Sequence, residues 1–209
     1  MLLSGESNMK CMICKNEMVP YFTKTMGSRM HVYLNCKSCG LVIDETTYGM
    51  KSEDWVELND LNKEAYGIDK IPDSDPNYIE RLIEQAAAID NMYRCGVFGD
   101  NIKAIDYGCG DGKLSEYIDE HYIANTGSKL DEHIIGKYDK YLRPEGALDY
   151  YDSTEVKSGM FDLVITCSVF ERLLGMKDVN EILLLANDTG TVALHTLVCE
   201  EVPRDPEWY

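Results

Sequence analysis

The chain has 209 residues, of which 44% are hydrophobic and 27% are charged, a balance that is typical of a globular protein and excludes wholesale disorder. The formal net charge is −17, so the average surface field repels polyanions and disfavours a nucleic-acid substrate, although it leaves room for a local basic patch. No stretch approaches the ~20 apolar residues of a membrane helix, and the first residues do not form a signal peptide. We therefore expect a cytoplasmic protein.

Two CxxC pairs lie near the N-terminus, Cys11 with Cys14 and Cys36 with Cys39. Two residues between cysteines allow a tight turn to direct both thiolates at one metal, and four thiolates are a ligand set of structural zinc. Such a site leaves no open coordination position, so it folds the chain and does no chemistry. The alternative interpretation is a set of buried or redox-active cysteines.

The cysteine pairs define a predicted zinc-ribbon lobe over residues 1–45, with Gly40 easing the backbone after the second pair. Short β-like runs at residues 30–34 and 41–43 belong to this lobe. Residues 46–98 predict a helical linker or cap, in which a break at two prolines separates two helices. These helices are predicted over residues 53–66 and 78–89.

From residue 99 onward, short apolar runs alternate with helical segments. This alternation predicts parallel βαβ units and therefore an α/β domain, a Rossmann-like, doubly wound and mostly parallel sheet over residues 99–209. The predicted strands cover residues 102–107, 134–138, 161–166 and 191–197, and the predicted helices cover residues 113–120 and 179–186.

The first of these strands runs into a glycine-rich turn, DYGCGDG, at residues 106–112. Glycines allow the backbone to turn sharply and to approach a ligand at the carboxyl end of the strand, where doubly wound sheets bind nucleotides. The dinucleotide pattern GxGxxG would need its third glycine where Lys113 stands, and a P-loop pattern is absent. Asp106 would repel a pyrophosphate, whereas it would attract a sulfonium cation.

This turn resembles the first motif of class I S-adenosylmethionine-dependent methyltransferases. Residues 161–173, FDLVITCSVFERL, resemble the fourth strand and the following turn of the same family. The resemblance implies S-adenosylmethionine as cofactor and methyl transfer as activity. The arrangement of zinc lobe, helical linker and methyltransferase domain resembles bacterial enzymes that methylate nucleotide-linked sugars or capsular polysaccharides, which implies a small sugar substrate.

The resemblance also implies a cofactor site at the ends of successive strands. The family has an acid after the second strand that accepts hydrogen bonds from both ribose hydroxyls; its best match here is Asp139, with Asp131 as a competitor and a solvated loop acid as the other interpretation. Asp152 is predicted to close the third strand and face the adenine, unless it is an ordinary turn residue. The cofactor-binding residues implied by the resemblance are Asp106, Gly108, Cys109, Gly110, Asp139, Asp152 and Cys167.

Methyl transfer to a hydroxyl requires a general base, and histidine is the natural candidate near neutral pH. Many relatives carry Glu-His where this chain has Glu171 and Arg172; arginine cannot act as the base but can hold an anionic group. His195, near the end of the predicted fifth strand, is the alternative base, and its other interpretation is a core histidine. The predicted catalytic residues are therefore His195, Glu171 and Arg172.

Two other functions remain open. An RNA methyltransferase is one, because some zinc-bearing relatives modify RNA. The other is a non-catalytic cofactor-binding or assembly module, because the family's sheet continues through two further strands and this chain stops before them. An open sheet edge predicts either a covering partner, such as a second copy in a homo-oligomer, or N-terminal segments that fold over it. Trp208 and Tyr209 are predicted to stack on a sugar ring or to pack the end of the chain.

Overall fold

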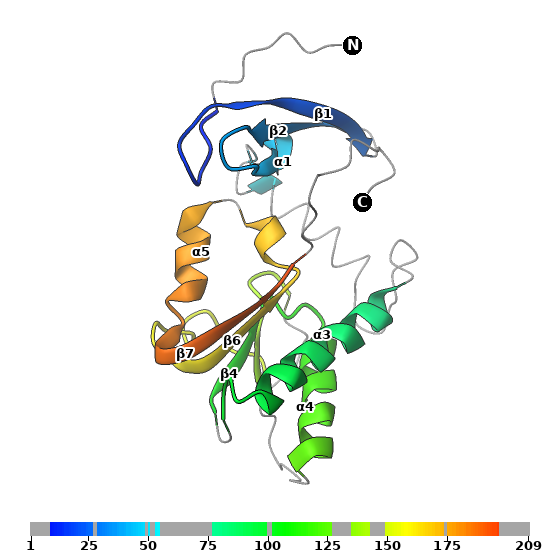
Figure 1. The fold of residues 1–209 in the computed structure, drawn as a ribbon, viewed down its shortest axis with the longest axis vertical. Coiled ribbons are helices and arrows are strands. Elements are labelled where there is room, and N and C mark those ends of the chain that lie inside the picture. Colours follow the sequence, from blue (N-terminus) through cyan, green and yellow to red (C-terminus); the bar gives the residue numbers. More distant parts are fainter. Residues whose placement is uncertain are drawn as a thin grey trace. The chain divides into compact units, whose positions relative to one another are not determined.

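The computed structural model describes residues 9–26, 29–48, 50, 53–54, 77–99, 102–126, 135–142, 149–173 and 175–196. They form two compact units (Figure 1). The smaller unit contains the described residues of 9–54 together with residues 175–176, and the larger unit contains those of 77–173 and 177–196. The predicted domain boundaries after residues 45 and 98 stay a prediction. No helix among the described residues is long and apolar enough to cross a bilayer.

The smaller unit is an antiparallel sheet with the strand order β1-β2-β3. The strands are β1 (Met18–Met26), β2 (Arg29–Cys36) and β3 (Val42–Asp44), followed by the short helix α1 (Glu45–Tyr48). β2 and β3 lie where strands are predicted, whereas β1 is not predicted by the sequence. The core of this unit is small, and its buried residues are Cys11, Met18, Leu34 and Cys36.

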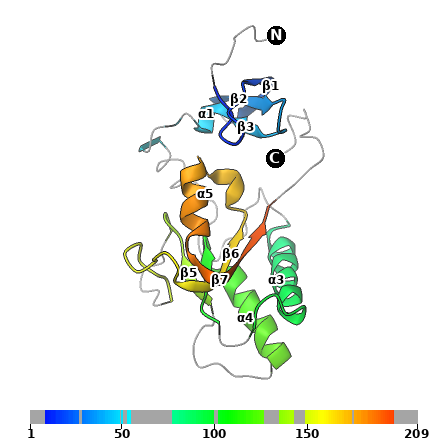
Figure 2. The same ribbon diagram turned by 60° about the vertical axis from the view of Figure 1, so that its left-hand side comes forward.

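The larger unit contains a four-stranded sheet with the strand order β5-β4-β6-β7, in which all three strand pairs are parallel (Figure 2). The fold is therefore α/β with a parallel sheet, together with a small N-terminal antiparallel lobe, as predicted. Tyr150 adds a single parallel bridge to Lys137 on the free side of β5. The strands are β4 (Ala104–Tyr107), β5 (Ile135–Tyr138), β6 (Phe161–Cys167) and β7 (Ala186–His195).

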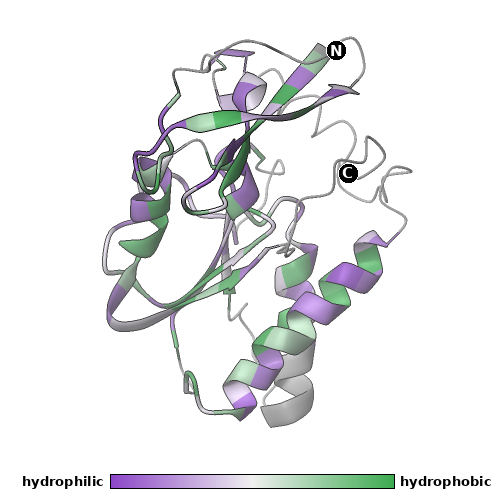
Figure 3. Ribbon diagram, turned by 45° about the horizontal axis from the view of Figure 1, so that its top comes forward, coloured by the Kyte–Doolittle hydropathy of each residue, from purple (hydrophilic) through white to green (hydrophobic). Residues whose placement is uncertain are grey.

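Helices cover both faces of this sheet. On one face α3 (Tyr78–Arg94) and α4 (Lys113–Thr126) share a core with Ala104 of β4, and on the other face α5 (Met176–Leu183) shares a core with Ile105. Neighbouring residues of a strand point to opposite faces, which explains why both are buried. Figure 3 shows polar and apolar bands alternating along α3, as expected for a helix that is apolar on one side only.

The strand order places a topological switch point between β4 and β6. The chain leaves β4 for β5 on one side and then crosses back to β6 on the other side. In doubly wound sheets, ligands bind outside the carboxyl ends of the strands at such a point. The glycine-rich turn follows β4 directly, so the fold places it at this position.

Two predicted elements are misplaced at the end of the larger unit. The predicted helix 179–186 is wrong by three residues, because α5 spans Met176–Leu183 and Ala186 already belongs to β7. β7 therefore begins five residues before the predicted strand 191–197. The run of apolar residues between them fits a helix and a buried strand equally well, so periodicity alone did not separate the two. The predicted helix 53–66 lies outside the described residues except at positions 53 and 54.

Candidate functional site

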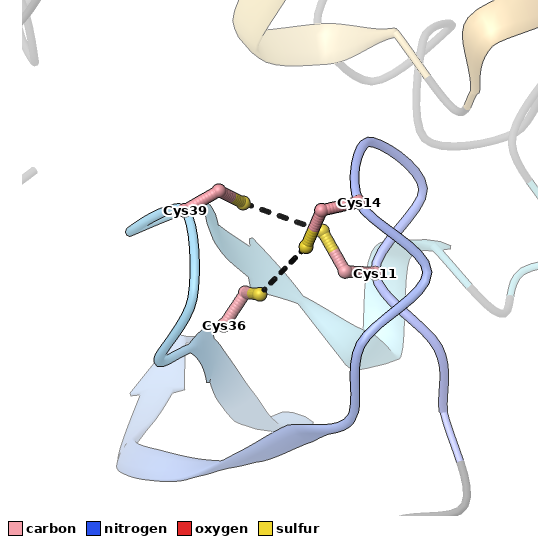
Figure 4. Close-up of side chains that lie close together, drawn as sticks. All are labelled: Cys11, Cys14, Cys36 and Cys39. Atoms are coloured by element: carbon pink, nitrogen blue, oxygen red, sulfur yellow. Dashed lines mark hydrogen bonds between the residues drawn. The ribbon is translucent and has the colours of Figure 1, made fainter.

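The four cysteines of the two CxxC pairs form one cluster in the smaller unit (Figure 4). The Sγ atoms of Cys11 and Cys39 are 3.5 Å apart, those of Cys14 and Cys36 are 3.3 Å apart, and all four lie within 4.8 Å of one another. Four sulfurs bound tetrahedrally at ~2.3 Å from a zinc ion would be about 3.8 Å apart. The cluster therefore has the size and the ligand chemistry of a four-thiolate metal site.

Two equivalent turns position these thiolates. The backbone N–H of Lys15 donates to the carbonyl of Cys11 at 3.0 Å, and the N–H of Gly40 donates to the carbonyl of Cys36 at 2.8 Å. Lys15 has φ of 63° and Gly40 has φ of 80°, so each CxxC pair is followed by a residue in the left-handed region. The sequence predicts this conformation at Gly40 but not at Lys15, where a side chain makes it less favourable.

One thiol of the cluster is biased toward the ionised form that binds metal. The backbone N–H of Asn16, with help from the Cys36 thiol and the Asn16 side chain, lowers the pKa of Cys14 to about 6. Metal ligands must be thiolates, so this environment favours binding.

The glycine-rich turn of the larger unit is fixed to the end of β5. The backbone N–H groups of Gly108 and Cys109 both donate to the carbonyl of Tyr138, at 2.7 and 3.2 Å. Gly108, Gly110 and Gly112 have φ values of 77°, 57° and 79°. L-residues rarely adopt this region, so the turn depends on glycine at these positions.

The three glycines differ in what surrounds them. A Cβ on Gly108 would lie 2.5 Å from Val169 Cγ2, and one on Gly112 would lie 2.8 Å from Lys137 Cδ and from the Tyr150 hydroxyl. The turn after β6 thus packs against the glycine turn. The two motifs that resemble those of the methyltransferase family, residues 106–112 and 161–173, therefore lie next to each other. At Gly110 a Cβ would meet no atom of the described residues within 4 Å, so among these residues the position faces open space.

Asp139, at the end of β5, lies beside this open position. Its Oδ2 accepts a hydrogen bond from the Gly110 N–H at 3.0 Å, and its Oδ1 accepts from the N–H groups of Tyr141 and Leu142, both at 2.8 Å. A carboxylate has about four lone-pair sites, so at least one remains for a further donor. The competitor Asp131 lies outside the described residues, and the ribose-binding role of Asp139 stays a prediction.

Two acids lie at the glycine turn, one in β4 directly before it and one within it. Asp106 is 1% exposed and accepts a hydrogen bond from Ser115 Oγ at 2.9 Å; burial raises the pKa of Asp106 to about 7. Asp111 Oδ1 accepts from the Tyr78 hydroxyl at 2.9 Å, which links α3 to the turn. Asp111 Oδ2 is buried and accepts no hydrogen bond within the described ranges, although Lys113 Nζ lies 3.4 Å away.

Three predicted cofactor-binding residues remain, namely Cys109, Cys167 and Asp152. Cys109 and Cys167 flank the edge at the ends of β4 and β6, where burial raises the pKa of the Cys109 thiol far above its usual range and that of Cys167 to about 12. Both thiols are therefore neutral at physiological pH.

Asp152 is exposed, and its Oδ1 accepts from the N–H and hydroxyl of Thr154, both at 2.9 Å. This is the geometry of a turn residue, and its adenine contact stays a prediction.

The predicted catalytic residues gather at the carboxyl ends of β6 and β7. Cys167 pairs with His195 across the two strands. Glu171 is exposed in the short helix η1 (Phe170–Arg172), and its Oε2 accepts from the Thr196 hydroxyl at 2.9 Å. Arg172 is also exposed. The structure brings His195 and Glu171 to the same edge of the sheet, whereas their catalytic roles stay predictions.

Several side chains at this edge are not predicted from the sequence. The Tyr150 hydroxyl donates to the Gly110 carbonyl at 3.0 Å, and the amide nitrogen of Gln85 lies 3.1 Å from His195 Nδ1. Tyr78 and Gln85 both come from α3, before the sheet begins. Gln85 could have been found, because it is the polar residue on the face of α3 that otherwise carries Leu82, Ala86 and Ile89.

Trp208 and Tyr209, which are predicted to stack on a sugar ring or to pack the end of the chain, lie outside the described residues.

Comparison with known proteins gives one distant relative at this point. The chain is 22% identical over 140 residues to the tRNA:m(4)X modification enzyme TRM13 of Saccharomyces cerevisiae. The similarity covers 59% of this chain and 28% of the yeast protein, so the chain spans little more than a quarter of that relative. No protein-family model matches the chain, and no solved structure matches it at a significant level. The chain is thus similar to a tRNA-modifying enzyme, without a family being shown.

Proposed function

We propose that the larger unit binds S-adenosylmethionine at the carboxyl edge of its sheet and transfers the methyl group to an acceptor in RNA. One observation carries the cofactor assignment. At the switch point between β4 and β6, the Gly110 N–H donates to Asp139, which comes 29 residues later in the chain. A glycine turn beside an acid at the end of the neighbouring strand matches the way in which doubly wound folds hold a nucleoside, with the acid accepting hydrogen bonds from the ribose.

The residues at this edge fit the cofactor. Gly110 faces open space, and Asp139 has lone pairs available for hydroxyl donors. Asp111 Oδ2 is buried and faces the Lys113 ammonium at 3.4 Å without a hydrogen bond among the described residues, so it could accept one from the amino group of the methionine half. Asp106 is buried in β4, directly before the turn, and its ionised form would favour a cation over a pyrophosphate. The cofactor would supply a methyl group that is already activated by its positive sulfur.

The protein's own contribution is mainly positional, since displacement at an activated carbon depends on alignment of the two reactants. Val169 packs against Gly108 and holds the turn after β6 against the glycine turn. Cys167 does not act as a nucleophile, because burial keeps its thiol neutral. Glu171 and Arg172 are exposed at the same edge and are available to orient the acceptor.

The distant similarity to a tRNA-modifying enzyme supports RNA as the acceptor. The sugar acceptor predicted from the sequence gains no support from the comparison. The net charge of −17 opposes an RNA substrate, but it is not evenly distributed. Residues 9–44 contain five Lys and Arg against two acids, whereas the rest of the chain contains 15 Lys and Arg against 35 acids. The small lobe is therefore the part of the chain on which a polyanion is least repelled.

We also propose that the ion held by the cysteine cluster is zinc and that its role is structural. Four thiolates fill the coordination sphere of a tetrahedral ion, so no position is left for a substrate or a water molecule.

Methyl transfer from radiolabelled S-adenosylmethionine tests the acceptor. We expect label to enter bulk tRNA and not a panel of nucleotide-linked sugars, with a rate that falls steeply as salt is raised, since RNA binding releases counterions. Label in the sugars would restore the sugar-methylating function. Cofactor binding without any transfer would instead support the non-catalytic module.

A further inference from the structure

Gln85 is a buried polar residue in direct contact with a candidate catalytic histidine. It lies on α3, it is 2% exposed, and its side-chain nitrogen Nε2 is 3.1 Å from His195 Nδ1 and 3.4 Å from Ser168 Oγ. On the same face of the helix lie the apolar residues Leu82 and Ala86. A buried amide on an apolar face costs free energy unless it is hydrogen-bonded, so the contacts to His195 and Ser168 stabilise its presence there.

The identity of the contacting atom decides where the histidine carries its proton. An amide nitrogen has two hydrogens and no acceptor capacity. With the amide oriented so that Gln85 Nε2 faces Nδ1 of His195, the amide donates and the ring nitrogen accepts, which places the hydrogen of the neutral ring on Nε2. The second hydrogen of the amide is directed at the Ser168 hydroxyl oxygen.

Backbone contacts also fix the position of His195. Ser168 has φ of 56°, an unusual conformation for a residue with a side chain. Its N–H donates to the His195 carbonyl at 2.9 Å, and the preceding Cys167 pairs with His195 across β6 and β7. Strained residues of this kind persist where surrounding contacts fix them, and they cluster at functional sites. His195 itself is partly exposed among the described residues.

We propose that Gln85 is a positioning residue that holds His195 in the Nε2–H tautomer, so that His195 donates a hydrogen bond to the substrate and does not take its proton. This inference rests on the proposed function and specifies the substrate group: an atom with a lone pair lies opposite Nε2–H. The acceptor atom then attacks through an existing lone pair, the electron pair of the broken methyl–sulfur bond stays on sulfur, and any proton that the acceptor loses goes to water.

The tautomer can be measured without substrate or cofactor. Two-dimensional ¹H–¹⁵N spectra of the histidine rings, recorded on the full chain at pH 8, separate a protonated ring nitrogen from an unprotonated one. The His195 signals are identified by their loss in His195→Gln. We expect a protonated Nε2 and an unprotonated Nδ1. A protonated Nδ1, or a rapidly exchanging mixture of both forms, would overturn the inference.

Two variants of Gln85 sharpen the test. In Gln85→Glu a carboxylate, which only accepts, replaces the donor, so the proton should move to Nδ1 of His195. In Gln85→Met, which has a similar shape but no hydrogen bond, the preference between the two nitrogens should be largely lost. If Gln85→Glu does not fold, the wild-type spectrum still decides. Calorimetry with S-adenosylmethionine on the same wild-type sample tests the proposed function separately, because the tautomer is read without the cofactor.

Discussion

The two units of this chain are stabilised in different ways. The larger unit has an apolar core on each face of its sheet, built from strands and helices distant in sequence. The smaller unit buries four core residues, and two of these, Cys11 and Cys36, belong to the cysteine cluster. So small a core among the described residues contributes little stability, which agrees with the proposal that a metal ion stabilises the smaller unit.

The two units also differ in how they change the ionisation of an acidic side chain. In the larger unit Asp106 is fully buried and its pKa is raised by burial, so one acid of the sheet is kept close to its neutral form. In the smaller unit the backbone instead favours the thiolate of Cys14.

The largest effect expected is that of removing the metal. Cys36→Ser should reduce the zinc content from about one ion per chain to almost none. The lobe should then unfold, because structural zinc contributes apparent free energies of about 10–16 kcal/mol to such sites. Metal analysis and amide hydrogen exchange measure this, with protection lost in β1, β2 and β3 and retained in β4 to β7.

Cys95→Ser is the matched control, since Cys95 is exposed and lies outside the cluster. It should retain both zinc and protection. A wild-type protein that is fully folded without metal would disprove the zinc site, and loss of protection in both units would show that they do not fold separately.

A smaller effect is expected from the buried acid of the larger unit. The pKa of Asp106 in the folded protein, about 7, lies above its ordinary value of 3.8. Between pH 4 and pH 7 the folded state therefore retains a proton that the unfolded state has lost, so this contribution is fully present below pH 4 and disappears as the pH rises through 7. Asp106→Asn, which cannot ionise, should gain stability over the wild type as the pH rises from below 4, by on the order of 4 kcal/mol at pH 8.

Denaturant unfolding at pH 5 and pH 8 measures this difference. Asp188→Asn changes an exposed acid of β7 and should leave the pH dependence as it is in the wild type. An Asp106→Asn variant that runs parallel to the wild type at both pH values would show that the carboxyl group titrates normally.

Local patterns predicted much of the fold and part of the site. The two CxxC pairs predicted the cluster because ligand spacing is a property of the chain itself. The run from Asp106 to Gly112 predicted a strand, a turn and a helix in that order, and the structure has β4, a turn of positive φ values and α4 there.

What the sequence could not predict depends on contacts between distant segments. Tyr78 and Gln85 reach the site from α3, a helix that precedes the sheet. Helical periodicity marks Gln85 as a polar residue on an apolar face, but it does not show that this face meets the end of β7. β1 has no clear alternation, since a register shift between Pro20 and Phe22 interrupts its pairing with β2. The start of β7 was obscured by the continuous apolar run after α5.

Binding of S-adenosylmethionine at the glycine turn tests the central claim most directly. Calorimetry should show binding to the wild type and none to Gly110→Arg, whose side chain would fill the open space at that position. Gly159→Arg is the matched control, because Gly159 has φ of 70° and open space around it but lies before β6, at the other edge of the sheet. Binding by the wild type and by Gly159→Arg alone would support the account; NAD binding in place of S-adenosylmethionine, or equal binding by Gly110→Arg, would contradict it.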